Sequence, residues 1–272
     1  MSLVFAGVCS HAPGITGRKE RADPVVRDAF YAAYDRMRVA LEASKPDALV
    51  VIGAEHFANF FMNNMPSLCV GMGEVYEGPI EDEAWLGIKR AKVPGATDLS
   101  KRLIEDAMQT VDLAYAQEWK FDHGIMVPLS FLTPRYDLPV IPVNINCQGP
   151  PLIPLHRCYE FGRALRRACD KVPERIAVIG TGGISHWPAT PDSGKINEAW
   201  DRAFLERFLN SKRDELLAYR DDETWREAGQ GGLEIRTFIA VSGATEGTHG
   251  ELWFYAPIPI FAVGCTVAVM KV

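Results

Sequence analysis

The stretch RIAVIGTGGISHWP, residues 175–188, decides the fold because it predicts a buried strand that ends in a glycine loop and a histidine. Residues 176–179 are a short apolar run of the kind that forms a parallel strand covered on both faces. The three glycines in residues 180–183 allow the backbone to turn tightly or to approach a ligand, and His186 follows at once. Ligands of open α/β sheets bind outside the carboxyl ends of the strands, so we expect a functional side chain here.

The pattern of a strand followed by a histidine occurs twice more. Residues 3–9 predict a first strand, which is followed by His11, and residues 48–52 predict a second strand, which leads to His56. Between them lies a well-signalled helix, for which Asp23 is the expected N-cap. The order strand, helix, strand is the unit that builds parallel sheets, and it predicts an α/β fold.

The rest of the chain continues this alternation. Further helices are predicted over residues 98–110, 125–132, 154–171, 196–210 and 233–241, and further strands over residues 68–71, 113–116, 138–145, 253–256 and 260–270. Pro139 and Pro142 favour an edge or distorted position for the strand that contains them. Thr97 is a candidate N-cap, and residues 76–93 are polar and irregular. Because no repeat, low-complexity tract or linker interrupts the sequence, residues 1–272 are predicted to form a single domain.

Composition argues against several classes of function. The 272 residues are 47% hydrophobic, which is enough for a sizeable core, and no window is long and apolar enough to cross a bilayer. A formal net charge of -6 without a long basic run argues against a nucleic-acid surface. The chain starts without a basic signal region, and its six cysteines form no CxxC pair. We therefore expect a soluble cytoplasmic protein with reduced thiols, whose partners are small molecules or other subunits, with no membrane partner.

Four of the six histidines are expected near one edge of the predicted sheet. His11, His56 and His186 follow strands, and His123 lies in a fourth loop. One such histidine alone is more often structural than a ligand, but four at the mouth of one sheet favour a shared site.

A metal site requires a carboxylate beside these histidines. Two imidazoles and one carboxylate on one face of a metal leave positions open for substrate and O2, as in non-haem Fe(II) oxygenases. Glu234 is the candidate because it lies in the first turn of an apolar helix, although the same position would also complement the helix dipole. Glu55 competes, but as the neighbour of His56 in an extended segment it would tend to point to the opposite face. Spacing alone does not decide whether a metal binds.

Five motifs carry a resemblance to a known family. In order along nearly the whole chain they are SHAP (residues 10–13), EHF (55–57), DHG (122–124), GTGGISH (180–186) and GLE (232–234). With these motifs the chain resembles the class III extradiol ring-cleaving dioxygenases, the LigB superfamily that includes the protocatechuate 4,5-dioxygenase β subunit. The glycine-rich motif that ends in His186 is the most specific of the five.

The resemblance implies a fold, a reaction and a set of site residues. The fold would be a three-layer α/β/α arrangement with a central, mostly parallel or mixed sheet. The reaction would be the Fe(II)-dependent insertion of both atoms of O2 into a catecholic, aminophenol or hydroxypyridone ring, which opens. His11, His56 and Glu234 would ligate the iron, and His186 and His123 would act as acid/base residues. The family also implies a homo-oligomer, or a partnership with a small α subunit that caps the site.

The chemistry accounts for the acid/base residues and for part of the substrate pocket. A catechol must lose protons to bind iron, and a neutral histidine is a suitable base near pH 7. We expect Phe57 and Phe60 to line an aromatic pocket, and Gly182 and Gly183 to contact the substrate. Asp122 could orient an imidazole, but side chains that are adjacent in sequence seldom hydrogen-bond productively.

Two other functions use the same residues. A metal-dependent hydrolase would need the same two histidines and one glutamate with an activated water, and the missing HExxH motif counts only against its zincin version. A non-catalytic metal-binding relative of the same fold is the other alternative. Retention of both His186 and His123 speaks against it, because a binding scaffold has no use for a base.

Overall fold

The computed structural model describes residues 2–54 and 56–272, so Glu55 lies outside the described residues. The strands are β1 (Leu3–Cys9), β2 (Ala48–Ala54), β3 (Leu68–Gly71), β4 (Val75–Gly78), β5 (Ala91–Pro94), β6 (Ala114–Ala116), β7 (Val140–Ile145), β8 (Ile176–Thr181), β9 (Gly250–Ile258) and β10 (Val263–Met270). The α-helices are α1 (Gly14–Gly17), α2 (Pro24–Ala43), α3 (Glu83–Leu86), α4 (Thr97–Ala107), α5 (His123–Leu132), α6 (Leu155–Cys169), α7 (Glu198–Leu209), α8 (Arg213–Leu217), α9 (Asp221–Ala228) and α10 (Ile235–Ala244). Two short 3₁₀ helices are η1 (Lys19–Arg21) and η2 (Gly231–Glu234). Within the described ranges, no helix is both long and apolar enough to span a membrane.

The central feature is a mixed sheet. Among the described residues, eight strands pair in the order β6-β3-β7-β2-β8-β1-β10-β9. The four inner strands β7, β2, β8 and β1 are parallel, whereas β3 and β10 run antiparallel to their inner neighbours. The carboxyl ends of β1, β8 and β2 therefore lie side by side at one edge of the sheet. This arrangement confirms the predicted α/β fold with a mostly parallel or mixed sheet.

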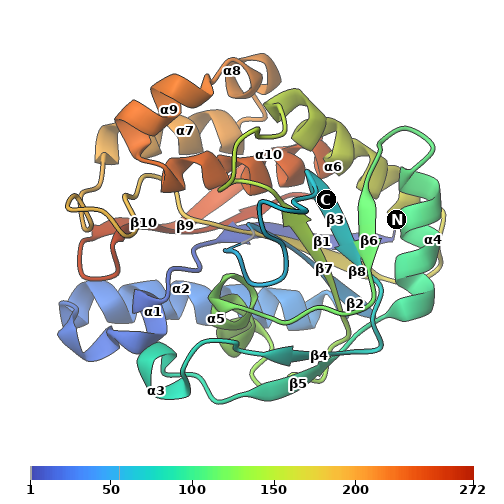
Figure 1. The fold of residues 1–272 in the computed structure, drawn as a ribbon, viewed down its shortest axis with the longest axis horizontal. Helices are drawn as coiled ribbons and strands as arrows, with labels where there is room; N and C mark the ends of the chain where they lie inside the picture. Colours follow the sequence, from blue (N-terminus) through green and yellow to red (C-terminus); the bar gives the residue numbers. More distant parts are fainter. Residues whose placement is uncertain (1, 55) are drawn as a thin grey trace.

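Helices cover both faces of this sheet, which gives the three-layer arrangement expected from the family resemblance (Figure 1). Helices α4, α6, α7 and α10 pack on one face, and α2 and α5 pack on the other. Helix α2 begins where the sequence predicts, because the Asp23 carboxylate accepts hydrogen bonds from the backbone N–H groups of Val25 and Val26. The buried apolar side chains form two clusters, one on each side of the sheet.

The position of β7 differs from the one that its prolines indicate. Strand β7 contains Pro142, yet it lies between β3 and β2 and not at an edge. Its ladder to β3 ends at the pair Val70 and Val143, and Val143 is the residue that follows the proline in sequence. Beyond that pair, Gly71 lies against the proline ring at a place where a Cβ atom would overlap it. A neighbouring glycine and an early end of the ladder therefore allow proline in an interior strand.

Two local predictions were wrong. Residues 76–93 are not irregular, because they contribute β4, α3 and β5, and the two strands pair as a separate small sheet. Tyr76 and Val93 are buried in the core beneath the main sheet, so tertiary packing stabilises strands too short to show a clear sequence pattern. Thr97 is not the N-cap of α4. That position is Ala96, and the Thr97 hydroxyl has no hydrogen-bond partner among the described residues.

Helices α6 and α10 approach each other closely at two glycines. A Cβ atom at Gly162 of α6 would overlap the backbone carbonyl of Ala240, and one at Gly243 of α10 would overlap the carbonyl of Tyr159. Backbone atoms cannot move aside as a flexible side chain can, so the separation of these two helices depends on both glycines.

We expect Gly162→Ala to destabilise the protein by about 2 kcal/mol or more, because the added methyl group must push α10 away from α6. Urea unfolding followed by circular dichroism measures this loss. The control is Arg163→Ala, a change at the neighbouring solvent-facing residue, which should cost less than about 1 kcal/mol. An unchanged urea midpoint for Gly162→Ala would contradict the close approach of the helices.

Candidate metal centre

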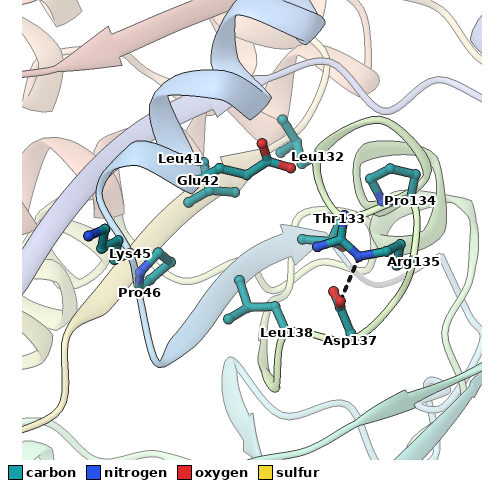
Figure 2. Close-up of a pocket in the computed structure, with 10 residues that line it drawn as sticks. All are labelled: Leu41, Glu42, Lys45, Pro46, Leu132, Thr133, Pro134, Arg135, Asp137 and Leu138. Atoms are coloured by element: carbon teal, nitrogen blue, oxygen red, sulfur yellow. Dashed lines mark hydrogen bonds and ion pairs between the residues drawn. The ribbon is translucent and has the colours of Figure 1, made fainter.

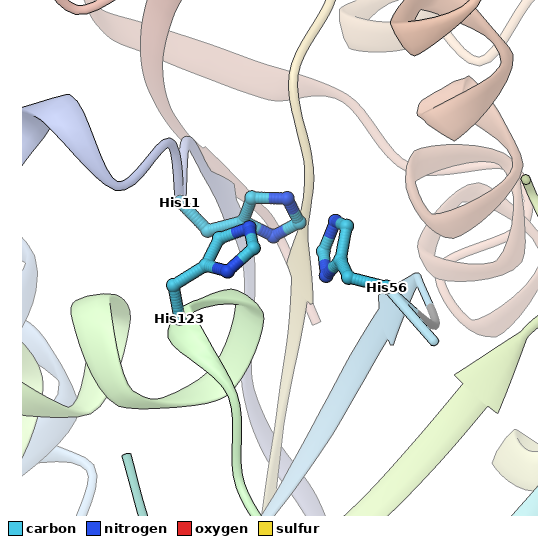
Figure 3. Close-up of side chains that lie close together, drawn as sticks. All are labelled: His11, His56 and His123. Atoms are coloured by element: carbon cyan, nitrogen blue, oxygen red, sulfur yellow. The ribbon is translucent and has the colours of Figure 1, made fainter. Parts of the chain in front are cut away.

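Four histidine side chains meet at the carboxyl edge of the sheet. His11 follows β1, His56 follows β2 and His186 follows β8, as the sequence predicts, while His123 is the first residue of α5. The ring centroids of His11 and His56 are 5.0 Å apart, and those of His56 and His123 are 4.2 Å apart (Figure 3). One ligand nitrogen each from His11, His56 and His123 lies within 4.8 Å of the other two.

Glu234 places a carboxylate among these rings. It ends η2 just before α10, and its side chain is almost completely buried. Its Oε2 atom lies 3.3 Å from His11 Nε2 and 3.7 Å from His186 Nε2, and its Oε1 atom lies 3.3 Å from His56 Nε2. The structure thus brings together the predicted ligand residues and the predicted base.

The tautomer of His11 follows from its neighbours. Its Nδ1 atom lies 3.1 Å from the hydroxyl oxygen of Thr181, and that hydroxyl donates its only proton to the carbonyl of Gly124 at 2.8 Å. Thr181 can therefore only accept from His11, so Nδ1 carries the ring proton. The lone pair of neutral His11 is consequently at Nε2, the atom that faces Glu234.

His56 is held in the same way by a carboxylate. Its Nδ1 atom donates to Asp122 Oδ2 at 2.8 Å, while the other Asp122 oxygen accepts the Gly124 N–H at the N-terminus of α5. Burial alone would raise the pKa of Asp122, but the adjacent His56 holds it at about 2. Asp122 therefore does orient an imidazole, but that of His56, 66 residues away, and not that of its sequence neighbour.

Burial alone would lower the pKa of His56, but Asp122 and Glu234 together raise it well above 6.5. The space between these two carboxylates therefore favours a positive charge. A bound metal cation would supply that charge and would displace the proton from Nε2.

His123 has a partner that the sequence did not reveal. Its Nδ1 atom donates to Glu81 Oε1 at 2.6 Å, and the same oxygen accepts the backbone N–H of His123 at 2.9 Å. Glu81 lies between β4 and α3, in a segment without a recognisable motif, so no sequence signal identifies it. Burial and the neighbouring His56 lower the pKa of His123, and Glu81 partly opposes this shift.

His186 is anchored by its own loop. Its Nδ1 atom donates to the carbonyl of Ile184 at 3.1 Å, which leaves Nε2 without a proton when the ring is neutral. The ring occupies space that a Cβ atom at Gly183 or Gly231 would fill. Burial lowers the pKa of His186, so its imidazole is neutral near pH 7.

The surroundings of Glu234 keep it ionised. Its oxygens accept the backbone N–H of Gly183 at 2.5 Å and the side-chain amide of Gln148, which follows β7, at 3.2 Å. Burial alone would raise the pKa of Glu234, but the neighbouring histidines, His11 foremost, lower it well below 4.5. Once a metal displaces the proton of His56, the Nε2 atoms of His11 and His56 and the ionised carboxylate form a donor set that fits a divalent metal ion.

The four predicted substrate-binding residues differ in their exposure and in what they contact. Phe57 is 42% exposed, and its φ of 57° lies in the left-handed region that a bulky residue rarely adopts. Phe60 packs edge-on against Trp119 at 5.4 Å between ring centroids. Gly182 lies against the Glu234 side chain, and Gly183 holds its carboxylate. Contact with a substrate remains a prediction for all four residues.

A cavity lies at the opposite end of β2 from the histidines. Its volume is about 450 Å³. Two of its lining residues, Arg135 and Asp137, form an ion pair with a separation of 2.7 Å, which is drawn as a dashed line (Figure 2). Its lining residues come from the C-terminal ends of α2 and α5 and the segments after them: Leu41, Glu42, Lys45, Pro46, Leu132, Thr133, Pro134, Arg135, Asp137 and Leu138. This cavity contains none of the predicted site residues.

Fold and site together define an α/β protein with a cluster of histidines and a buried carboxylate at the carboxyl edge of its sheet. Residues 6–266 match the family described as the catalytic LigB subunit of aromatic ring-opening dioxygenase, and the chain belongs to this family. The resemblance stated from the sequence motifs is thereby confirmed. Membership supports a ring-cleaving dioxygenase that uses an aromatic substrate and O2, in a family whose members depend on a metal.

Relatives resemble the chain over most of its length. The 2,3-dihydroxyphenylpropionate/2,3-dihydroxicinnamic acid 1,2-dioxygenase of Cupriavidus necator is 28% identical, over 95% of this chain and 92% of that protein. The enzyme of the same name from Mycolicibacterium paratuberculosis is 26% identical, over 88% and 90% respectively. The crystal structure of uncharacterized protein JW3007 from Escherichia coli K12 has the same fold, with a TM-score of 0.66, 19% identity and coverage of 99% of this chain and 100% of that one.

A buried carboxylate, that of Asp201 on α7, hydrogen-bonds both the loop that carries His186 and Tyr255 of β9. Asp201 accepts the backbone N–H of Ser185 at 2.8 Å and the hydroxyl of Tyr255 at 2.6 Å. Asp201 is fully buried, and this burial raises its pKa to about 6.

We expect Asp201→Asn to remove a pH dependence of stability. Because the pKa of about 6 in the folded protein exceeds the ordinary 3.8, the folded state binds more protons between these values, and its stability falls as pH rises through them. The loss amounts to about 3 kcal/mol above pH 6. An asparagine can accept from Ser185 through its oxygen and donate to the Tyr255 hydroxyl through its amide. The variant should therefore gain about 3 kcal/mol of stability relative to the wild type as the pH rises from about 4 to 7, measured by urea unfolding.

Asp192→Asn at an exposed position is the control, and its stability should follow the wild type across the same pH range. Parallel curves for wild type and Asp201→Asn would show that Asp201 does not carry the raised pKa.

Proposed function

We propose that this protein is an Fe(II)-dependent extradiol dioxygenase that inserts both atoms of O2 into a catecholic ring and opens it beside the two hydroxyls. The observation that carries this proposal is the position of the Glu234 carboxylate between two histidines. Its Oε2 atom lies 3.3 Å from His11 Nε2, and its Oε1 atom lies 3.3 Å from His56 Nε2. Ligands about 2.1 Å from one metal are about 3 Å apart at adjacent positions, so these contacts suit three ligands on one face.

Bound there, Fe(II) would hold the two catechol oxygens and O2 on one centre and allow electrons to pass between them. The protein's part is to keep three donors fixed and the remaining positions free. Thr181 and Asp122 do this by engaging the Nδ1 atoms of His11 and His56, so that each ring can present only Nε2 to a metal.

His186 is proposed as the base that takes a proton from a catechol hydroxyl. Its Nε2 atom lies 3.7 Å from Glu234 Oε2, beside the position proposed for the metal. The lowered pKa keeps this nitrogen free to accept a proton near pH 7, and the bond to Ile184 keeps it pointed toward the site.

His123 is proposed as the second acid/base residue. Although one of its nitrogens lies within 4.8 Å of the ligand atoms of His11 and His56, a three-histidine set would lack negative charge, which Glu234 supplies. We therefore assign His123 to proton transfer as the ring opens, and not to the metal.

The names of the relatives support a catechol as the substrate. The enzymes from Cupriavidus necator and Mycolicibacterium paratuberculosis are named for 2,3-dihydroxyphenylpropionate and its cinnamic analogue. Identity of 26–28% supports the class of substrate, so we propose a catechol and place the phenylpropanoid catechols first in the test. Family membership also favours this reaction over the metal-dependent hydrolase and the non-catalytic relative.

The test is anaerobic reconstitution with Fe(II), followed by oxygen uptake on a panel of catechols. We expect one O2 consumed per catechol, with a matching rise in the visible absorbance of a yellow semialdehyde, and neither signal when Zn²⁺ replaces Fe(II). Tight metal binding without oxygen uptake on any catechol would contradict the proposal.

The same assay on variants separates metal binding from proton transfer. His11→Ala, His56→Ala and Glu234→Ala should fail to retain iron, whereas His186→Gln should retain iron and lose turnover by about 10²- to 10⁴-fold. His156→Ala is the control, because this exposed residue on α6 has no assigned role and should leave iron content and turnover unchanged. An iron-replete His186→Gln variant with full activity would refute the base assignment.

A further inference from the structure

Glu81 binds His123 at two points. Its Oε1 atom accepts both the ring Nδ1–H at 2.6 Å and the backbone N–H at 2.9 Å. The two donors fix the ring of His123 relative to its own backbone, because both must point at a single oxygen. Glu81 Oε2 is buried and has no hydrogen-bond partner among the described residues, so the interactions of this carboxylate centre on His123.

This contact determines which nitrogen of His123 carries the proton. A carboxylate accepts hydrogen bonds and donates none when ionised, so Nδ1 must be the protonated nitrogen. The pKa of Glu81 is shifted downward, since the contact with His123 outweighs the effect of burial, and the carboxylate is ionised near pH 7. Without this acceptor, a neutral imidazole can hold its proton on either nitrogen.

The geometry leaves Nε2 as the free nitrogen of His123. In Figure 3 the ring of His123 points toward the rings of His11 and His56. Asp122, the carboxylate next to His123 in sequence, cannot take the place of Glu81, because its oxygens already accept from His56 and from the backbone of α5. Each of the two carboxylates therefore serves a different histidine.

We propose that Glu81 is a positioning residue that holds His123 as its Nδ1–H tautomer and so presents an unprotonated Nε2 to the substrate. Nε2 can then take up one proton and later give it back, and no oxidant or co-reactant is needed. The effect on turnover rests on the proposed function, in which His123 transfers a proton. The tautomer itself does not depend on that function.

The tautomer is measured in the metal-free protein by nitrogen-15 NMR of the imidazole rings, with His123→Gln used to assign the signals. Wild type and Glu81→Gln should both show the Nδ1–H tautomer, because a glutamine side chain still offers an oxygen acceptor. Glu81→Ala should show a mixture of tautomers. Glu77→Gln, an exposed position on β4, is the matched control and should not change the spectrum of His123.

The kinetic arm uses the iron-loaded enzyme on the best catechol of the panel. Glu81→Ala should lower kcat by about 10- to 100-fold with iron content and KM unchanged, and Glu81→Gln should restore most of the loss. A merely structural role would instead change iron content and KM together. In that case Glu81→Gln would not restore kcat selectively.

The Nε2–H tautomer in the wild-type protein would overturn the proposal, even if Glu81→Ala did not fold. An unchanged tautomer and kcat in a folded Glu81→Ala variant would overturn it equally. If the wild type turned over no catechol but showed the predicted tautomer in wild type and Glu81→Gln and lost it in Glu81→Ala, the proposed function would fail while the assignment of Glu81 stood.

Discussion

The buried carboxylate of Glu234 is the constraint on which the rest of the site depends. An ionised carboxylate in a protein interior costs several kcal/mol unless charges and hydrogen bonds compensate it. Gly183 and Gln148 donate to it, and the Nε2 atoms of His11 and His56 lie on either side. A cation between these nitrogens and the carboxylate, as the proposed function requires, would compensate the buried charge directly.

The fold and the site share their anchoring contacts. Strands β1, β8 and β2 are adjacent and parallel, so the residues after them necessarily approach one another. Thr181, the last residue of β8, links His11 to the first turn of α5, and Asp122 caps that helix while it holds His56. The contacts that fix the histidine tautomers therefore also tie the ends of the strands to α5, and the site gains its rigidity from the sheet.

Much of this arrangement could be predicted from sequence because it follows from strand ends. The apolar runs before His11, His56 and His186 identify parallel strands, and parallel strands place their carboxyl ends together. The partners of the rings could not be predicted. Glu81 lies 42 residues from His123 in a segment without a motif, and Asp122, although it belongs to the DHG motif, contacts His56, 66 residues away, and not its neighbour His123. The interior position of β7 was missed for a similar reason, because a glycine on another strand makes room for its proline.

The most direct measurement is a crystal structure of the Fe(II)-loaded protein prepared without oxygen. The account predicts that His11 Nε2, His56 Nε2 and one oxygen of Glu234 lie about 2.0 to 2.2 Å from the metal, with His123 and His186 nearby but not bound to it. A metal held by His11, His56 and His123, with Glu234 outside its ligands, would contradict the account.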